Sequence, residues 1–275
     1  MRSGSVPTPL QVGRMYDLVT PLLTAVAGGP CGIHHGYWED DGRSPLADAV
    51  DRLTDLVAGR TPLAPGTRVL DVGCGTGQPA LRIAGGADVQ VTGITVSESQ
   101  VAMAAARARE LGLAHRVRFA LVDAMALPYP DNAFDAAWAM QSLLEMTEPE
   151  RAIGEVFRVL EPGGVLVVAD VVTRAPGDGE SVAGDMWPTG LRVCTAGQLV
   201  DSLASAGFLI DACEDVSPGT RYFMPSYARA LAERGREIAD AYGPGVAAWA
   251  AAVGDYEDYA EDMGYALVTA RKPAG

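Results

Sequence analysis

The segment VLDVGCGTGQPA, residues 69–80, constrains the fold of this chain more than any other part of its sequence. An apolar run contains Asp71 near its end, glycines follow at 73, 75 and 77, and a helix is expected next. Gly73 and Gly75 allow a sharp turn and let a ligand approach the backbone without interference from a Cβ atom. The start of the helix offers free N–H groups. This corner predicts a nucleotide site at the carboxyl end of a strand in an α/β sheet, and a tight turn without a ligand is the alternative.

The glycine spacing distinguishes between kinds of nucleotide site. The loop reads G-x-G-x-G, which differs from the G-x-G-x-x-G of dinucleotide sites, and it lacks the Lys-Ser/Thr ending of a phosphate-binding loop. An Asp two positions before the first glycine, after a hydrophobic strand, resembles motif I of the class I S-adenosylmethionine (SAM) methyltransferases. The resemblance implies that Asp71, Gly73 and Gly75 lie at a SAM site.

Composition narrows the class of partner. The formal net charge of −14 disfavours nucleic acid, because a protein that binds phosphates needs a basic face, and it equally disfavours an anionic membrane surface. No apolar run approaches the ~20 residues of a membrane span, and the N-terminus lacks the apolar block of a signal peptide. The scattered cysteines, without metal-type pairing, are typical of reduced cytosolic thiols. We therefore expect a cytoplasmic protein that acts on a small molecule; its oligomeric state is left open.

Strands and helices alternate between residues 60 and 172, which predicts a parallel sheet with right-handed crossovers. The fold expected from the resemblance is α/β: a class I methyltransferase Rossmann-like sheet, mostly parallel, with a final antiparallel strand and a helical lid. Its expected parts are an N-terminal helical cap (1–58), a SAM-binding core (59–216), a lid insertion (217–262) and the last strand of the sheet (263–275). The expected core strands are 68–73, 89–94, 117–122, 134–139, 165–171 and 208–216.

Two further segments extend the resemblance to the cofactor site. DAMALPYPDNAFD at 123–135 is similar to the family segment in which an Asp contacts the adenine amino group, which implies adenine contacts from Asp123 and Ala124. Asp123 can alternatively cap a turn. The family's usual acid after the second strand is missing, and GITVSESQ at 93–100 is similar to a subgroup in which Thr95 and Gln100 take the ribose.

The N-terminal segments MYDLVTP (15–21) and GIHHGYWED (32–40) also match this subgroup, which includes sugar O-methyltransferases, sterol methyltransferases and cyclopropane synthases. The match implies that Tyr16 and Tyr37 cover the methionine end of SAM, where an aromatic face can stabilise a sulfonium. Ordinary aromatic packing is the alternative. The adjacent His34 and His35 suggest a metal, but the sequence has no second ligand cluster, so we expect none.

The chain departs from the family in the loop after the fourth core strand. In the similar sugar O-methyltransferases this loop carries a His pair, and one His is the general base for the sugar hydroxyl. Here the loop reads QSLLEM over 141–146, with Leu144 and Glu145 in place of the pair, while the acidic partner Asp170 remains. His suits this task because its pKa lies near neutrality. Leu144 cannot accept a proton, and Glu145 could do so only with a raised pKa.

Two main hypotheses about function are consistent with a chain that retains the SAM site but lacks the usual catalytic base. The chain as a whole resembles the methyltransferase-like [4+2] cyclases of polyketide antibiotic biosynthesis. That resemblance implies a Diels–Alder-type closure of a cyclohexene ring in a macrocyclic polyene, with SAM or S-adenosylhomocysteine bound but not consumed. The alternative is a SAM-dependent O- or C-methyltransferase of a natural product that uses another base. A SAM-binding regulatory or scaffold protein is a third hypothesis.

A cycloaddition within one ring requires no acid or base at the reacting carbons. A protein can accelerate it by holding the reactive conformer and by donating a hydrogen bond to a carbonyl conjugated with the dienophile. We expect Gln141, an amide, and Thr189, a hydroxyl, to be the donors. Trp249 and Trp187 would provide apolar walls. Each of these four side chains can alternatively serve only in packing.

Overall fold

A seven-stranded sheet forms the centre of the protein in a computed structural model, which describes residues 7–29, 32–174, 193–243 and 262–275. The strand order is β3-β2-β1-β4-β5-β7-β6. All neighbouring pairs are parallel except those of β7, which runs antiparallel to both β5 and β6. This confirms the expected fold. The strands are β1 (Arg68–Val72), β2 (Gln90–Thr95), β3 (Val117–Leu121), β4 (Phe134–Met140), β5 (Leu160–Thr173), β6 (Leu209–Asp215) and β7 (Met263–Arg271).

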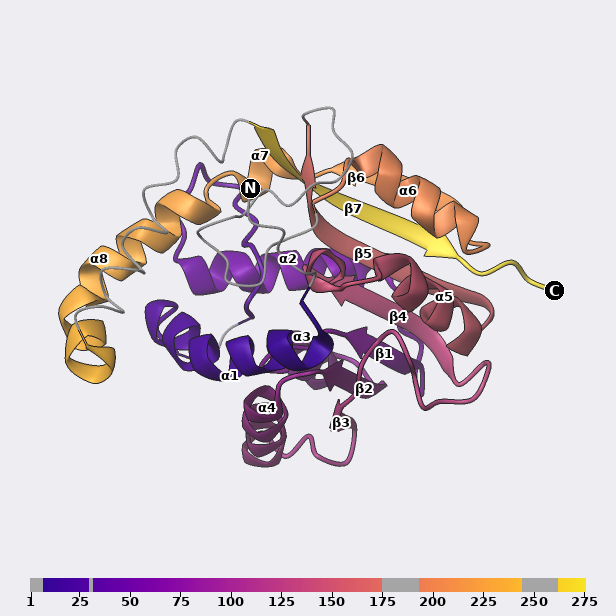
Figure 1. The fold of residues 1–275 in the computed structure, drawn as a ribbon, viewed down its shortest axis with the longest axis horizontal. Helices are drawn as coiled ribbons and strands as arrows, with labels where there is room; N and C mark the ends of the chain where they lie inside the picture. The colour runs from indigo at the N-terminus through magenta and orange to yellow at the C-terminus, as the bar shows by residue number, and fades with distance from the viewer. Residues whose placement is uncertain (1–6, 30–31, 175–192, 244–261) are drawn as a thin grey trace.

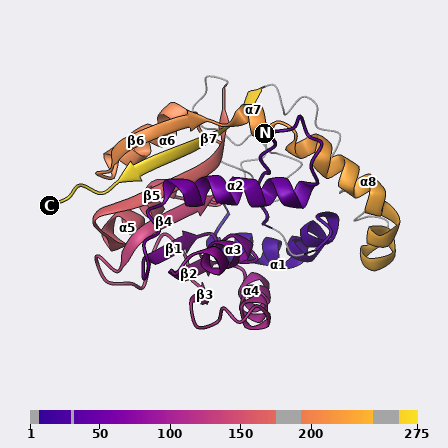
Figure 2. The same cartoon turned by 180° about the vertical axis from the view of Figure 1, so that it is seen from behind.

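Helices cover both faces of the sheet (Figures 1 and 2). On one face α2 and α3 bury apolar side chains such as Leu53 and Leu81 against Trp138 of β4. On the other face α5 and α6 bury Ile153 and Leu203 against the same sheet. The helices are α1 (Pro9–Val26), α2 (Leu46–Arg60), α3 (Gln78–Gly86), α4 (Glu98–Glu110), the 3-10 helix η1 (Leu143–Glu145), α5 (Pro149–Val159), α6 (Ala196–Ser205), α7 (Ser217–Thr220) and α8 (Phe223–Tyr242).

A third apolar cluster joins the N-terminal segment to the insertion before β7. Leu22 of α1, Val50 of α2 and Leu231 of α8 pack in it, together with Trp38. Figure 1 shows α1 and α8 beyond the carboxyl ends of the parallel strands. The expected cap and lid therefore share one core in their described parts. Their boundaries stay predictions, because residues 244–261 of the lid lie outside the described residues.

The turn before the fifth strand differs from the sequence prediction, which began that strand at residue 165. β5 begins at Leu160, because the turn residues join the ladder. The Gly163 N–H donates to the Lys272 carbonyl at 2.9 Å, and the Lys272 N–H donates to the Gly164 carbonyl at 2.9 Å. Gly163 has φ +82°, in the left-handed region that glycine adopts without strain.

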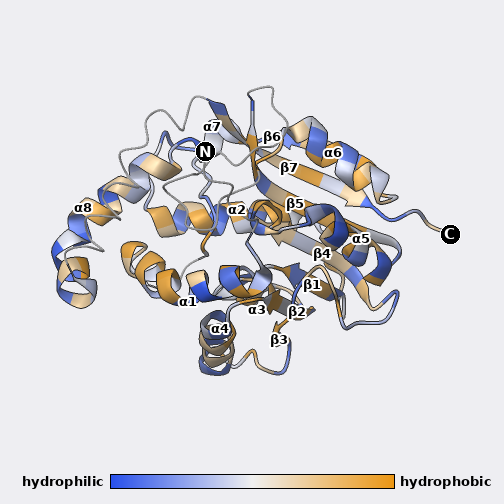
Figure 3. Cartoon of the chain, in the orientation of Figure 1, coloured by the Kyte–Doolittle hydropathy of each residue, from blue (hydrophilic) through white to orange (hydrophobic). Residues whose placement is uncertain are grey.

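Figure 3 shows polar and apolar residues together on helices such as α8. A helix of this kind can pack its apolar side inward while its polar side faces water. Across the described ranges, the structure contains no helix with both the length and the apolar character needed to cross a membrane.

Candidate active site

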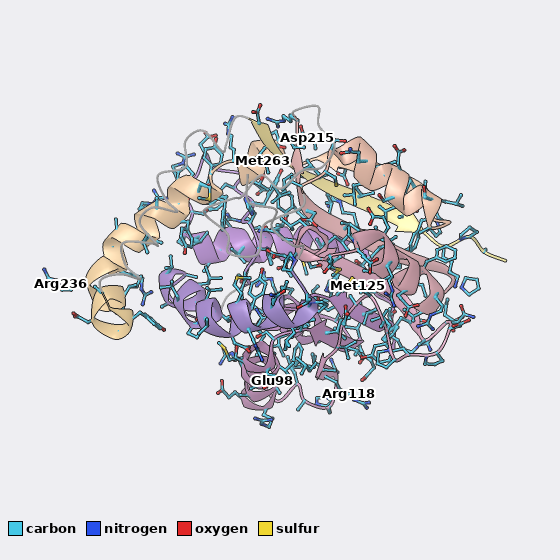
Figure 4. All side chains as sticks on the ribbon, in the orientation of Figure 1. Glu98, Arg118, Met125, Asp215, Arg236 and Met263 are labelled. Atoms are coloured by element: carbon cyan, nitrogen blue, oxygen red, sulfur yellow. The ribbon has the colours of Figure 1, made fainter. Side chains whose placement is uncertain are left out.

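A cavity opens at the carboxyl ends of β1, β2, β3 and β4 and encloses about 920 Å³ of empty space, counting the solvent at its mouth. The strand order reverses between β1 and β4, and this switch point is where α/β sheets bind ligands. Met125, labelled in Figure 4, belongs to its wall. Nine of the residues expected at the site also border it: Tyr16, Asp71, Gly73, Gly75, Thr95, Gln100, Asp123, Ala124 and Gln141.

The glycine loop after β1 forms the floor of this cavity. Gly73 has φ +75°, and a Cβ atom there would overlap the side chain of Ser142, whose hydroxyl donates to the Val72 carbonyl at 2.7 Å. Gly75 has φ +52°, and the nearest atom to a Cβ built there is Cδ1 of Ile33, at 3.8 Å. The first glycine therefore permits contact between the loops after β1 and β4, and the second leaves the backbone open to a ligand.

Asp71 presents an unsatisfied acceptor at the cavity wall. Its side chain is buried, with 2% exposure, and burial raises its pKa to about 7. Its Oδ2 atom has no hydrogen-bond partner within the described ranges. A buried carboxylate without a partner is costly, and a cationic ligand group nearby would both pair with it and lower its pKa. The site thus fits a ligand that carries a positive charge at this end, as SAM and S-adenosylhomocysteine do through their ammonium group.

Thr95 and Gln100 interact with each other and with α1. The Thr95 hydroxyl donates to Oε1 of Gln100 at 2.7 Å, and Nε2 of Gln100 donates to the Thr20 hydroxyl at 3.1 Å. A second contact fixes α1 beside them, because Asp17 accepts from the Ser97 hydroxyl at 2.6 Å. Both predicted ribose ligands border the cavity in this network. Their contact with a ribose stays a prediction.

Asp123 and Ala124 border the opposite part of the cavity, after β3. Oδ1 of Asp123 accepts from the backbone N–H of Met125 at 2.9 Å, so the carboxylate holds the turn, as the alternative interpretation expected. One carboxylate has about four acceptor positions, so this bond leaves capacity for an adenine amino group. The adenine role of this pair stays a prediction.

The two tyrosines expected over the methionine end occupy different places. Tyr16 borders the cavity, and its hydroxyl donates to Oε1 of Glu145 at 3.0 Å. Tyr37 is not part of the cavity wall in the described structure. Its ring lies against Gly219, where a Cβ atom would overlap it, and its backbone N–H donates to the Ala49 carbonyl at 2.8 Å. The structure therefore places Tyr37 in packing between α2 and α7, and its contact with SAM stays a prediction.

Gln141 lies at the end of β4 and borders the cavity. Its Oε1 atom lies 2.9 Å from the backbone nitrogen of His35 and 2.7 Å from the imidazole Nδ1 of the same residue. His35 in turn borders a second cavity with Phe223, Met224 and Met263, the last of which is labelled in Figure 4. The Gln141–His35 pair therefore contributes to both cavities. Sequence reasoning missed this role of His35, because the histidine pair suggested only a metal.

Leu144 and Glu145, which the resemblance places where a His pair was expected, make other contacts. Leu144 is buried in the core, and Glu145 accepts from Tyr16. Asp170 is also buried, and burial raises its pKa to about 8, while the backbone N–H of Val171 donates to it at 2.9 Å. Neither Leu144 nor Asp170 is part of the first cavity's described wall. Asp170 is therefore present, but the loop after β4 contains no imidazole that this carboxyl could orient.

Several expected site residues lie outside the described residues, and the histidine pair is not part of a ligand cluster in the described ranges. Thr189, Trp187 and Trp249 lie outside the described residues. In the described ranges, no group of three or more His, Cys, Asp or Glu side chains is arranged to hold a metal ion. The imidazole of His34 lies 2.8 Å from the His35 carbonyl through Nδ1 and 3.2 Å from the Thr54 hydroxyl through Nε2.

Comparison with known proteins identifies the class to which this fold and site belong. A family model described as a methyltransferase domain matches residues 63–201. The chain is 40% identical over 279 residues to the 27-O-demethylrifamycin SV methyltransferase of Amycolatopsis mediterranei (strain S699), with 97% of this chain and 98% of that protein covered. The chain belongs to the methyltransferase-domain family.

Within that family, the chain is similar throughout to a solved cyclase. It shares 67% identity with the crystal structure of the [4+2]-cyclase SpnF, with 98% of each chain covered and a TM-score of 0.90. This confirms the resemblance to the methyltransferase-like [4+2] cyclases. The mycolic acid cyclopropane synthase CmaA1, solved with S-adenosylhomocysteine, shares the fold at a TM-score of 0.83 and 18% identity, with 98% of this chain and 99% of that chain covered.

Proposed function

We propose that this protein catalyses an intramolecular [4+2] cycloaddition of Diels–Alder type, which closes a cyclohexene ring within a macrocyclic polyene polyketide. The observation that carries the proposal is the 67% identity with the [4+2]-cyclase SpnF over 98% of both chains. The site agrees with it. The glycine-loop cavity is kept, while the positions of the family's His pair are taken by the buried Leu144 and by Glu145, which accepts from Tyr16.

The proposed resident ligand of the first cavity is SAM or S-adenosylhomocysteine. Asp71 would face its cationic amino-acid end, Thr95 and Gln100 its ribose, and Asp123 and Ala124 its adenine. In the proposed reaction this ligand supplies no reacting group and is not consumed. By binding only the native state, it would stabilise the folded chain by an amount that grows with the logarithm of its concentration relative to Kd.

The proposed source of catalysis is confinement together with one directed donor. Phe223, Met224 and Met263 form an apolar part of the second cavity, which would contact a hydrophobic ring, while Arg174 and Arg221 border the cavity with charged groups. Holding the diene and dienophile in contact removes much of the entropic barrier. Gln141 borders the first cavity, so the substrate would have to extend from the second cavity to this part of the first. There Gln141 would donate an amide hydrogen bond to a carbonyl conjugated with the dienophile, where charge develops in the transition state. Thr189 as a second donor and Trp249 as a wall complete the proposal, and both lie outside the described residues.

Mass spectrometry tests the reaction directly. The purified protein is incubated with a macrocyclic polyene polyketide that carries a diene and an activated alkene, and the SAM content is measured before and after. We expect a product of unchanged mass, formed faster than in buffer, with SAM constant over many turnovers. A matched sample with the surface variant His115→Phe should behave like the wild type. Conversion at the rate seen in buffer would overturn the proposal.

A SAM-dependent O- or C-methyltransferase of a natural product is the second candidate. The 40% identity with the rifamycin-related methyltransferase favours it, since that relative is also covered almost completely. A product heavier by one CH₂, formed in step with S-adenosylhomocysteine, would identify this activity. In either case we propose a small-molecule substrate, with no nucleic acid or membrane partner. The acidic charge and scattered cysteines support a cytoplasmic location.

A further inference from the structure

We infer that His35 is a positioning residue: it holds the amide oxygen of Gln141, so that the amide NH₂ group is the donor presented to the substrate. The inference rests on the proposed cycloaddition and deepens it. It concerns the two hydrogen bonds that join Gln141, which borders the first cavity, to His35, which borders the second.

The hydrogen-bond geometry assigns the atoms of this pair. The backbone nitrogen of His35 lies 2.9 Å from the amide atom of Gln141, and a backbone N–H can only donate. That amide atom must therefore be the oxygen. The imidazole Nδ1, at 2.7 Å from the same oxygen, must then carry the ring proton. Consequently the NH₂ of Gln141 points away from His35, and in the described structure no hydrogen bond holds it.

The backbone conformation of Gln141 indicates that the surrounding contacts fix the orientation of this residue. Its φ is +50°, in the left-handed region, and the other described non-glycine residues with positive φ are Asp41 and Asn132. Asp and Asn tolerate this region better than a longer side chain does. The Gln141 N–H donates to the Ala169 carbonyl at 2.7 Å, which ties the strained residue to β5. Strain of this kind persists only where the surrounding contacts determine the conformation.

His35 is itself held from the side of the lid. Its ring stacks on Phe223 of α8, with ring centroids 4.1 Å apart, and it lies 5.2 Å from the ring of Tyr265. Burial lowers the His35 pKa to about 4, so the ring is neutral in the tautomer that the bond to Gln141 requires. The chain of contacts therefore runs from α8 through His35 to the amide of Gln141. A displacement of Phe223 would therefore weaken the hold on the Gln141 amide without any direct contact between Phe223 and that amide.

A double-mutant cycle tests this indirect action. His35→Phe preserves a ring to stack on Phe223 and removes the Nδ1 donor, whereas His35→Asn retains a side-chain N–H. We expect His35→Phe to lower kcat about fivefold with KM nearly unchanged, the effect of one neutral hydrogen bond, and His35→Asn to recover most of it. In a Gln141→Ala background, His35→Phe should cause no further loss. The exposed His115→Phe serves as the matched control, and melting temperatures verify folding.

The cycle has a definite contrary outcome. If His35→Phe lowers kcat by the same factor with and without Gln141, His35 acts independently of the amide and the inference is overturned. Failure of the proposed function is distinguishable, because in that case the wild type itself would form no isomeric product.

A readout without substrate tests the same contact. In ¹⁵N-labelled protein the Gln141 side-chain NH₂ signals can be assigned by their loss in Gln141→Ala. We expect the two proton signals to exchange slowly with water in the wild type, and to shift toward the values of a mobile amide and exchange faster with water in His35→Phe. Unchanged signals in His35→Phe would show that His35 does not hold the amide.

Discussion

The hydroxyl of Tyr16 on α1 donates a hydrogen bond to Glu145 of η1, with 3.0 Å between the two oxygens. Both residues border the first cavity, so the bond connects α1 to the loop after β4 at the site itself. Burial, together with the nearby Glu145 carboxylate, raises the pKa of Tyr16 well above its ordinary value and keeps the phenol protonated. Glu145 lies where the resemblance leads one to expect a basic residue, yet here it accepts from Tyr16, which borders the cavity.

Removing the Tyr16 hydroxyl should loosen the hold of α1 on a bound ligand. We expect Tyr16→Phe to weaken the binding of S-adenosylhomocysteine about tenfold, because a hydrogen bond to a carboxylate contributes roughly 1.5 kcal/mol or more. The loss should appear mainly in the dissociation rate if α1 covers the bound ligand. Stopped-flow displacement and calorimetry measure both. Tyr129→Phe, at a ring packed against Phe134 at the start of β4, is the control. Equal affinities of wild type and Tyr16→Phe would contradict this role.

The carboxylate of Asp71 should be required for tight cofactor binding. Calorimetry should detect binding of SAM or S-adenosylhomocysteine to the wild type and weaker binding to Asp71→Ala and Asp71→Asn, which cannot pair with a cationic group. The rise in melting temperature on adding ligand should shrink in parallel, since ligand binding adds to the free energy of unfolding. Absence of binding to the wild type would rule out the cofactor assignment. Equal affinity in Asp71→Asn would show that the carboxylate does not face the charge.

The buried Asp170 should make stability fall with rising pH. Its pKa is raised to about 8 in the folded protein, against roughly 3.9 for an unfolded Asp, so the folded state prefers the neutral form. The contribution is complete below the unfolded pKa and is lost as pH rises toward 8. We expect the melting temperature of the wild type to fall between about pH 5 and pH 8 more steeply than that of Asp170→Asn. Parallel curves would contradict the raised pKa.

Local pattern predicted the parts of the site that depend on backbone conformation. The spacing of Gly73 and Gly75 after Asp71 predicted that these residues lie together at the cavity, because the turn between β1 and α3 requires glycine at those positions. Local pattern does not decide the role of Tyr37, because an aromatic residue near a ligand motif has the same pattern whether it packs on a ligand or on Gly219. The start of β5 was misjudged because its turn pairs with Lys272, a contact distant in the sequence.

The contacts that sequence reasoning missed join residues far apart in the chain. Tyr16 and Glu145 are separated by 129 positions, and His35 and Gln141 by 106. No periodicity relates such residues, and only the packing of α1 and the 32–40 segment over the sheet brings them together. The single available signal was the histidine pair, whose chemistry suits hydrogen bonding as well as metal binding.

A cage mechanism predicts small effects from the loss of any single polar group. Gln141→Ala and Thr189→Ala should each slow the cycloaddition about fivefold, the effect of one neutral hydrogen bond, and truncation of Trp249 should slow it as much by removing part of the cavity wall.

Asp170→Asn and Glu145→Gln should keep most of the activity, because no proton moves at the reacting carbons. For the same reason the rate should vary little from about pH 6 to pH 8. Single-turnover kinetics measure these effects. A loss of a thousandfold or more in Asp170→Asn or Glu145→Gln, in protein that is folded and loaded with SAM, would instead identify a general base and favour methyl transfer.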